Sequence, residues 1–243
     1  MKYALDVHTH TIVSGHAYST LMENAKAASE KGIKVLGTTE HGCMMPNAPH
    51  IWYFHNYKVL PREMYGVTML YGVEANILDH DGRMDMDYET LDKVDIVIGS
   101  IHEPIYNMGS VEENTRAYVN AIKSGKIDIV GHPGNPMIPV NYEEIVKCAV
   151  ENDVLIEINN SSFTTSRVGS LGNCTKIAEL CKKYKATIVI DSDAHFCTKI
   201  GEFKEAVDML TSINFPDELI INSEPKKLLE KLKRKGKLTD LNI

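Results

Sequence analysis

The sequence lacks the features that mark membrane-spanning and secreted proteins. No apolar run approaches the roughly 20 residues that a bilayer-spanning helix needs. The first ten residues, MKYALDVHTH, contain no apolar core of a signal peptide. The five cysteines show no CxxC spacing, and an odd, dispersed set is typical of reduced thiols. We therefore expect a cytoplasmic protein with no membrane partner.

The sequence also lacks an excess of basic residues and a P-loop. The 26 Lys and Arg residues face 33 Asp and Glu residues, which gives a formal net charge of -7. Tight nonspecific binding of DNA rests on neutralisation of phosphates by Lys and Arg, so we expect no stable nucleic-acid partner. No GxxxxGK[ST] motif is present, which argues against nucleotide hydrolysis of the P-loop type.

Strand-like and helix-like segments alternate along the 243 residues. The expected strands are 3–8, 35–41, 68–75, 95–102, 128–133, 155–160 and 187–193. Helical patterns lie between many of them, at 21–32, 111–125, 142–153 and 174–184. Ser110 and Asn141 are the expected helix N-caps, and Gly32 and Gly125 the expected C-caps.

This alternation predicts parallel strands joined by crossover helices, which is an α/β fold. Seven strands suit a closed or nearly closed β/α barrel that occupies residues 1–243 as a single domain. A doubly wound open sheet is the alternative. The sequence leaves the oligomeric state open, including a homo-oligomer.

Histidines and carboxylates recur at the carboxyl ends of the expected strands. The motif DVHTH (6–10) ends the first strand, and TTEH, GVEA, GSIH, GHP and DSDAH end later ones. In a β/α barrel these ends converge on one face, where active sites are built. The residues that would meet there are His8, His10, His16, His41, Glu74, His102, His132, Asp193 and His195.

Seven imidazoles and two carboxylates in one pocket indicate a metal centre. Any one of these histidines alone could be a structural residue with a hydrogen-bond partner. A buried cluster of imidazoles would repel itself on protonation, whereas imidazole nitrogen and carboxylate oxygen are common metal ligands. Nine ligands are too many for a single ion that also holds water, so two or three ions are implied.

The spaced set of motifs resembles the polymerase and histidinol phosphatase (PHP) superfamily, and within it the small stand-alone YcdX-type bacterial phosphatases. The resemblance covers nearly the whole chain, including EINNSS (157–162), SRVGS (166–170) and GEF (201–203). It implies a distorted seven-stranded (β/α)7 barrel of PHP type with three metal ions at the carboxyl-terminal face. It also implies zinc, while manganese or iron are alternatives.

The resemblance further implies how the nine residues divide among three ions. His8, His10, Glu74 and Asp193 would hold the first ion. Glu74 would bridge to a second ion held also by His102 and His132, and the third ion would be held by His16, His41 and His195.

The expected activity is hydrolysis of small phosphate monoesters by a metal-activated hydroxide, with no side chain as nucleophile. One alternative is a 3′-exonuclease-like phosphodiesterase on nucleic-acid ends. Another is a metal-binding regulatory protein without turnover. Arg167 could form bidentate hydrogen bonds to a substrate phosphate, or a surface salt bridge. Asp6 and Asp191 could orient metal ligands, or be buried carboxylates with no direct effect on catalysis.

Overall fold

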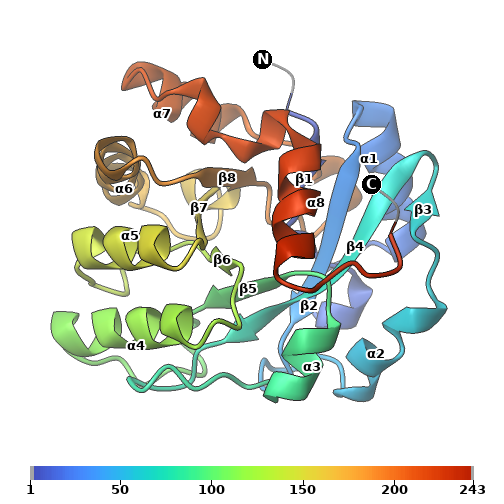
Figure 1. Ribbon diagram of the computed structural model, residues 1–243, viewed down its shortest axis with the longest axis horizontal. Helices are drawn as coiled ribbons and strands as arrows, with labels where there is room; N and C mark the ends of the chain where they lie inside the picture. Colours follow the sequence, from blue (N-terminus) through green and yellow to red (C-terminus); the bar gives the residue numbers. More distant parts are fainter. Residues whose placement is uncertain (1–2, 242–243) are drawn as a thin grey trace.

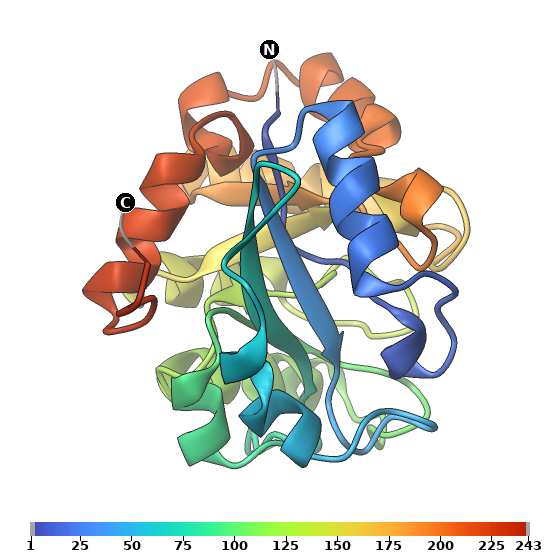
Figure 2. The same cartoon turned by 90° about the vertical axis from the view of Figure 1, so that its right-hand side faces the viewer.

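The computed structural model describes residues 3–241 and contains a nearly closed barrel of seven parallel strands (Figures 1 and 2). The strand order is β1-β2-β4-β5-β6-β7-β8. These strands are β1 (Leu5–Asp6), β2 (Val35–His41), β4 (Val67–Asn76), β5 (Val97–Ser100), β6 (Ile129–Val130), β7 (Leu155–Asn159) and β8 (Ile188–Asp191). The α/β barrel predicted from the sequence is confirmed, and the open sheet is excluded. The short strand β3 (Glu63–Met64), which pairs antiparallel with β4, was not predicted.

Helices surround the barrel. They are α1 (Leu21–Lys31), α2 (Trp52–His55), α3 (Tyr88–Lys93), α4 (Val111–Lys123), α5 (Tyr142–Glu151), α6 (Leu171–Tyr184), α7 (Lys204–Ser212) and α8 (Pro225–Arg234). Helices α4, α5 and α6 pack in a row on one side, at the left of Figure 1, and α1 lies on the other side. Within residues 3–241, none of these helices has the length and apolar content to cross a bilayer.

The predicted helix caps agree with the structure, with one small shift. The side chains of Ser110 and Asn141 accept hydrogen bonds from the backbone N–H groups three residues on, as N-caps do. Gly32 ends α1 with a positive φ of 80°, a conformation that glycine adopts without steric cost. Helix α4 ends one residue earlier than predicted, at the C-cap Ser124, and Gly125 follows with φ 70°.

The amino-terminal half of the barrel interior is apolar. Leu5, Val35, Leu70 and Ile129 come from four strands and form one buried cluster. Leu228 and Leu232 of α8, both 0% exposed, belong to the same cluster. Helix α8 therefore closes the end of the barrel where the strands begin, and in Figure 1 it lies in front of β1. The opposite end, where the strands finish, stays free for polar side chains.

Asn222, in the 3-10 helix η6 (Ile221–Ser223), joins β1 to β8 where the barrel does not close. Its side chain donates to the carbonyl oxygens of Leu5 and Ile190, at 3.0 and 2.6 Å. It accepts from the Ile190 N–H at 2.8 Å and is 0% exposed. A backbone bridge between Thr9 and Ala194 also links the two ends of the sheet, and the Asp6 and Asp191 side chains accept from backbone N–H groups across the same gap. Asn222 thus satisfies backbone groups that strand pairing would otherwise satisfy.

The closure by Asn222 predicts a large loss of stability for Asn222→Ala. Each buried backbone group left without a partner costs about 1–3 kcal/mol, so we expect the free energy of unfolding to fall by about 3 kcal/mol or more. Urea denaturation measures it. Ser223→Ala, on the next residue, is the control and should cost less than about 1 kcal/mol. Equal stabilities of the two variants would contradict the closing role of Asn222.

Candidate metal centre

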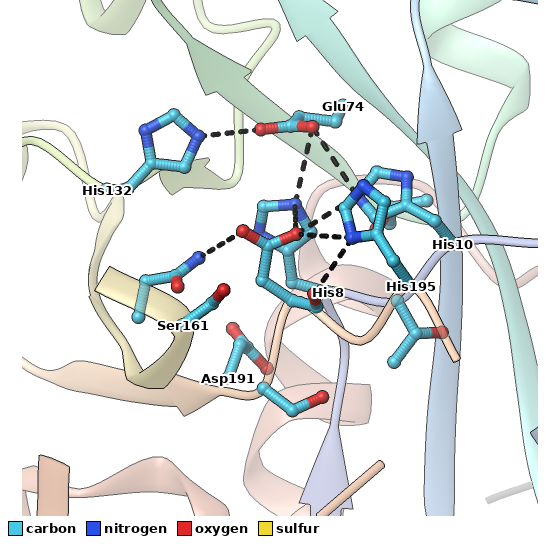
Figure 3. Close-up of polar contacts among 12 residues, drawn as sticks. His8, His10, Glu74, His132, Ser161, Asp191 and His195 are labelled. Atoms are coloured by element: carbon cyan, nitrogen blue, oxygen red, sulfur yellow. Dashed lines mark hydrogen bonds and ion pairs between the residues drawn. The ribbon is translucent and has the colours of Figure 1, made fainter. Parts of the chain in front are cut away.

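All nine predicted residues meet at the carboxyl-terminal mouth of the barrel. Figure 3 shows five of them, His8, His10, Glu74, His132 and His195. Glu74 lies within β4 and His41 is the last residue of β2. His102, His132 and Asp193 each lie two residues beyond their strands, β5, β6 and β8. His8 and His10 follow β1, His16 follows the 3-10 helix η1 (Ile12–Ser14), and His195 follows β8.

Glu74 lies at the centre of the cluster and is 1% exposed. Its Oε1 lies 2.9 Å from His132 Nε2 and 3.2 Å from His102 Nε2. Its Oε2 lies 2.8 Å from His41 Nδ1, 3.4 Å from His8 Nε2 and 3.6 Å from His10 Nε2. One carboxylate therefore faces five imidazoles that come from four different strand ends.

Asp193 and two further imidazoles complete the cluster on the side of β8. Asp193 Oδ1 lies 3.4 Å from His10 Nε2 and 3.7 Å from His8 Nε2. His16 and His41 approach through their Nε2 atoms at 3.2 Å, and the His16 and His195 rings are 4.9 Å apart. Exposure rises from the buried His8 and His10 through the partly buried His195 to the exposed His16. The cluster thus runs from the barrel interior to the surface.

Burial and mutual charges shift the pKa values of the cluster strongly. Burial opposes ionisation of Glu74 and Asp193, but the adjacent imidazoles, His8 foremost, hold both pKa values well below their usual range. Burial, with His41 and His195, lowers the pKa of His10 far below normal. Burial also lowers the pKa of His132, to about 4. These shifts favour ionised carboxylates and neutral His10 and His132, the forms that bind cations, whereas the nearby carboxylates raise the pKa of His8 against the effect of burial.

A second layer of side chains, which the sequence reasoning missed, holds the rings of three histidines. Glu157 Oε1 lies 2.6 Å from His8 Nδ1, and Asn76 Oδ1 lies 2.6 Å from His102 Nδ1. Ser14 Oγ lies 3.0 Å from His10 Nδ1. In each case the Nδ1 atom has a partner, which leaves Nε2 directed at the cluster. The only sequence signal was Glu157 within EINNSS, whose partner depends on how distant strands align.

Asp6, Asp191 and Arg167 have clear partners in the structure. The Asp6 carboxylate accepts from Ser192 and from the Gly201 N–H, rather than from a histidine. Asp191 Oδ1 accepts from the Val7 N–H at 2.7 Å. Both carboxylates therefore fix backbone between β1 and β8. The Arg167 guanidinium is not a surface group: it donates to Asp193 at 2.7 Å and to Ser162 at 2.8 Å.

The residues fit a group of metal ions. His8 Nε2, His10 Nε2, His41 Nδ1 and Glu74 Oε2 are buried and have no hydrogen-bond partner, although the last two form an ion-pair contact at 2.8 Å. Burying such atoms without a hydrogen bond is unfavourable, so their convergence suits the binding of cations. Two ligands about 2.0–2.1 Å from one tetrahedral ion stand about 3.3 Å apart, close to the 3.4–3.7 Å separations around His8, His10 and Asp193.

The tightest groupings differ in part from the division that the resemblance implies. Three sets bring their ligand atoms within 4.8 Å of one another. They are His8 with His10 and Asp193, His41 with Glu74 and His102, and His10 with His41 and His195. The first set contains three of the four residues implied for the first ion and lacks Glu74. In the second set, His41 takes the place expected for His132. In the third set, His10 takes the place expected for His16.

A cavity of about 930 Å³ opens over the cluster. Its floor includes His41, Glu74, His102 and Asp193. Hydroxyl and amide side chains of residues 160–166 line one part of its wall, together with Arg167. The cluster is therefore accessible from solvent to a small molecule.

The structure is a parallel α/β barrel with a cluster of candidate metal ligands at its carboxyl-terminal mouth. The sequence model of the PHP domain matches residues 6–161. The chain belongs to the PHP domain family, as its motifs predicted.

Full-length relatives share this family. A "probable phosphatase" of Clostridium novyi (strain NT) is 60% identical over 243 residues, which is 100% of both chains. A "probable phosphatase" of Caldanaerobacter subterraneus subsp. tengcongensis is 47% identical over 238 residues, 98% of this chain and 94% of the relative. The crystal structure of histidinol phosphate phosphatase from Lactococcus lactis, with zinc, L-histidinol and phosphate, has a TM-score of 0.65. At 15% identity, over 88% of this chain and 95% of that one, this likeness concerns the fold.

The unpaired ligand atoms predict that zinc stabilises the folded protein. An ion that binds the native state at 100 times its Kd adds about 2.7 kcal/mol to the free energy of unfolding. Denaturation in buffered zinc, compared with EDTA, measures the gain. Magnesium, which prefers oxygen ligands, is the control and should stabilise less. Identical midpoints in zinc and EDTA would contradict a metal centre.

Proposed function

We propose that this protein is a metal-dependent phosphatase that hydrolyses small phosphate monoesters. The observation that carries the proposal is the set of buried, unpaired imidazole and carboxylate atoms on the floor of an open cavity. The names of the full-length relatives support the same enzyme class. We further propose that the chain forms one barrel domain and that it works in the cytoplasm, where its five free cysteines would stay reduced.

The nine clustered residues would hold the metals, with zinc the preferred ion and three ions the number that the resemblance implies. His8, His10, Glu74 and Asp193 would hold the first, Glu74, His102 and His132 the second, and His16, His41 and His195 the third. Such ions, when bound, supply Lewis acids that polarise phosphate oxygens and lower the pKa of water. Manganese and iron also suit this mixture of nitrogen and oxygen ligands.

The protein itself would contribute position and charge. The low pKa values of Glu74 and Asp193 favour carboxylates that attract cations, and bound cations would in turn attract a phosphate. The Nδ1 partners Glu157, Ser14 and Asn76 fix the ring orientation of His8, His10 and His102. The barrel walls keep the deep side of the cluster away from bulk water, which strengthens electrostatic interactions with the substrate.

Arg167 would contact the substrate phosphate. Its guanidinium lies on the cavity wall beside Asp193, and its bonds to Asp193 and Ser162 use Nη2 and Nε. The ion pair with Asp193 holds the planar group in one orientation, and the remaining N–H groups suit a phosphate oxygen.

The 3′-exonuclease activity and the regulatory role without turnover are the competing functions, and the assay below separates them.

For His102→Ala we predict that aryl phosphate hydrolysis falls at least about 100-fold. Mutation of a residue that only supports a metal ligand already lowers metal affinity or activity about 10–100-fold. His50→Ala, at an exposed histidine that does not line the cavity, is the matched control and should retain wild-type activity. The steady-state rate with a generic aryl phosphate is the measurement.

The same assay includes a bis-aryl phosphate and a labelled oligonucleotide. Hydrolysis of the monoester alone supports the proposal. Cleavage of the oligonucleotide alone would support the exonuclease. Metals bound without hydrolysis of any of the three would favour the regulatory role.

For Arg167→Ala we predict that KM for the aryl phosphate rises and kcat/KM falls about 10–100-fold, because a hydrogen bond to a charged group is worth about 1.5–3 kcal/mol. Arg167→Lys should recover little of the lost kcat/KM, because lysine lacks the planar guanidinium with its paired N–H donors. Zinc content per chain should stay unchanged. A lower zinc content with an unchanged KM would show that Arg167 acts on Asp193 and not on the substrate.

A further inference from the structure

The carboxylate of Glu157 lies behind the metal-ligand cluster and contacts two of its members from the side opposite Glu74. Glu157 is the third residue of β7 and is 1% exposed. Its Oε1 lies 2.6 Å from His8 Nδ1, and its Oε2 accepts from the His132 backbone N–H at 2.6 Å. The two rings face each other with centroids 6.1 Å apart. Each of these two histidines therefore contacts both the Glu157 and the Glu74 carboxylates.

The contact with Glu157 constrains the backbone of His132. His132 has a φ of 27°, in the left-handed region that residues other than glycine rarely adopt. A conformation of this kind persists only when surrounding contacts impose it. The short bond to Glu157 is such a contact, and the turn that it holds brings His132 Nε2 to 2.9 Å from Glu74.

The contact with His8 bears on the position of its ring proton. The Glu157 Oε1 atom accepts a hydrogen bond across the 2.6 Å contact, so His8 Nδ1 carries the hydrogen. A ring that carries its hydrogen on Nδ1 offers a metal its other nitrogen, Nε2, which here is buried, has no hydrogen-bond partner and faces Glu74 and Asp193. This is the tautomer that a metal at Nε2 requires.

From these contacts we propose that Glu157 is a positioning residue that prepares two ligands at once, His8 through its tautomer and His132 through its backbone. The inference rests on the proposed metal centre. It assigns to one carboxylate the coupling of two ligands that the family resemblance places on different ions. Loss of that carboxylate would weaken metal binding at both.

The isosteric change Glu157→Gln tests the proposal sharply. A backbone N–H can only donate, so the carbonyl oxygen of the new side-chain amide must face the His132 N–H. The amide nitrogen then faces His8 Nδ1 and donates to it, which moves the ring hydrogen of His8 to Nε2, where the metal would bind. We therefore expect zinc affinity, measured by chelator competition, to fall about 10–100-fold.

The matched control is Glu103→Gln, the same change of charge at an exposed residue on the cavity wall. It should leave zinc affinity unchanged. Circular dichroism of the metal-free proteins checks folding, because a merely structural role would lower stability in the absence of zinc as well. Unchanged zinc affinity in Glu157→Gln would overturn the proposal.

A measurement on the wild-type protein decides the case even if the variant does not fold. In ¹⁵N spectra of the zinc-loaded protein, the hydrogen of His8 should lie on Nδ1. A His8 ring bound through Nδ1, or carrying hydrogen on Nε2, would overturn the proposal while leaving the metal centre intact. Wild-type protein that binds no zinc would instead refute the metal centre and the proposed function together.

Discussion

The buried carboxylate of Glu74 is the interaction on which the arrangement of the site depends. Five imidazoles lie within 3.6 Å of its two oxygens. Removing this charge from water is costly, and only the surrounding imidazoles or a bound cation can offset the cost. Since Glu74 is built into β4, a long strand flanked by β2 and β5, the barrel itself fixes the point at which the other ligands converge.

The two ends of the barrel have different roles: one contributes mainly to stability, and the other carries the candidate metal centre. At the amino-terminal end, apolar side chains and α8 form a closed interior, and Asn222 joins the two end strands. At the other end, β1 and β2 approach so closely that a Cβ at Gly37 would lie 2.7 Å from the Val7 carbonyl oxygen. Thr9 then donates to the Gly37 carbonyl at 2.7 Å, which fixes the chain between His8 and His10. The well-packed base thus supports the polar residues at the mouth.

The fold and the convergence of the nine residues could be predicted from the sequence, because parallel strands must place their carboxyl ends on one face. The detail of the first strand could not. Strand β1 ends at Asp6, two residues before the predicted end, and the Asp6 side chain bonds to Ser192. The partners of the histidine Nδ1 atoms also escaped prediction. Glu157 and Asn76 meet their histidines only through the alignment of strands distant in sequence.

The most direct test of a metal centre at the barrel mouth is X-ray diffraction from zinc-loaded crystals at wavelengths on either side of the zinc absorption edge. We predict two or three anomalous peaks among the nine residues, each about 2.0–2.2 Å from imidazole nitrogen or carboxylate oxygen. One of them should lie against Glu74. Crystals that contain zinc only at surface sites, with the atoms around Glu74 free of anomalous density, would contradict the assignment.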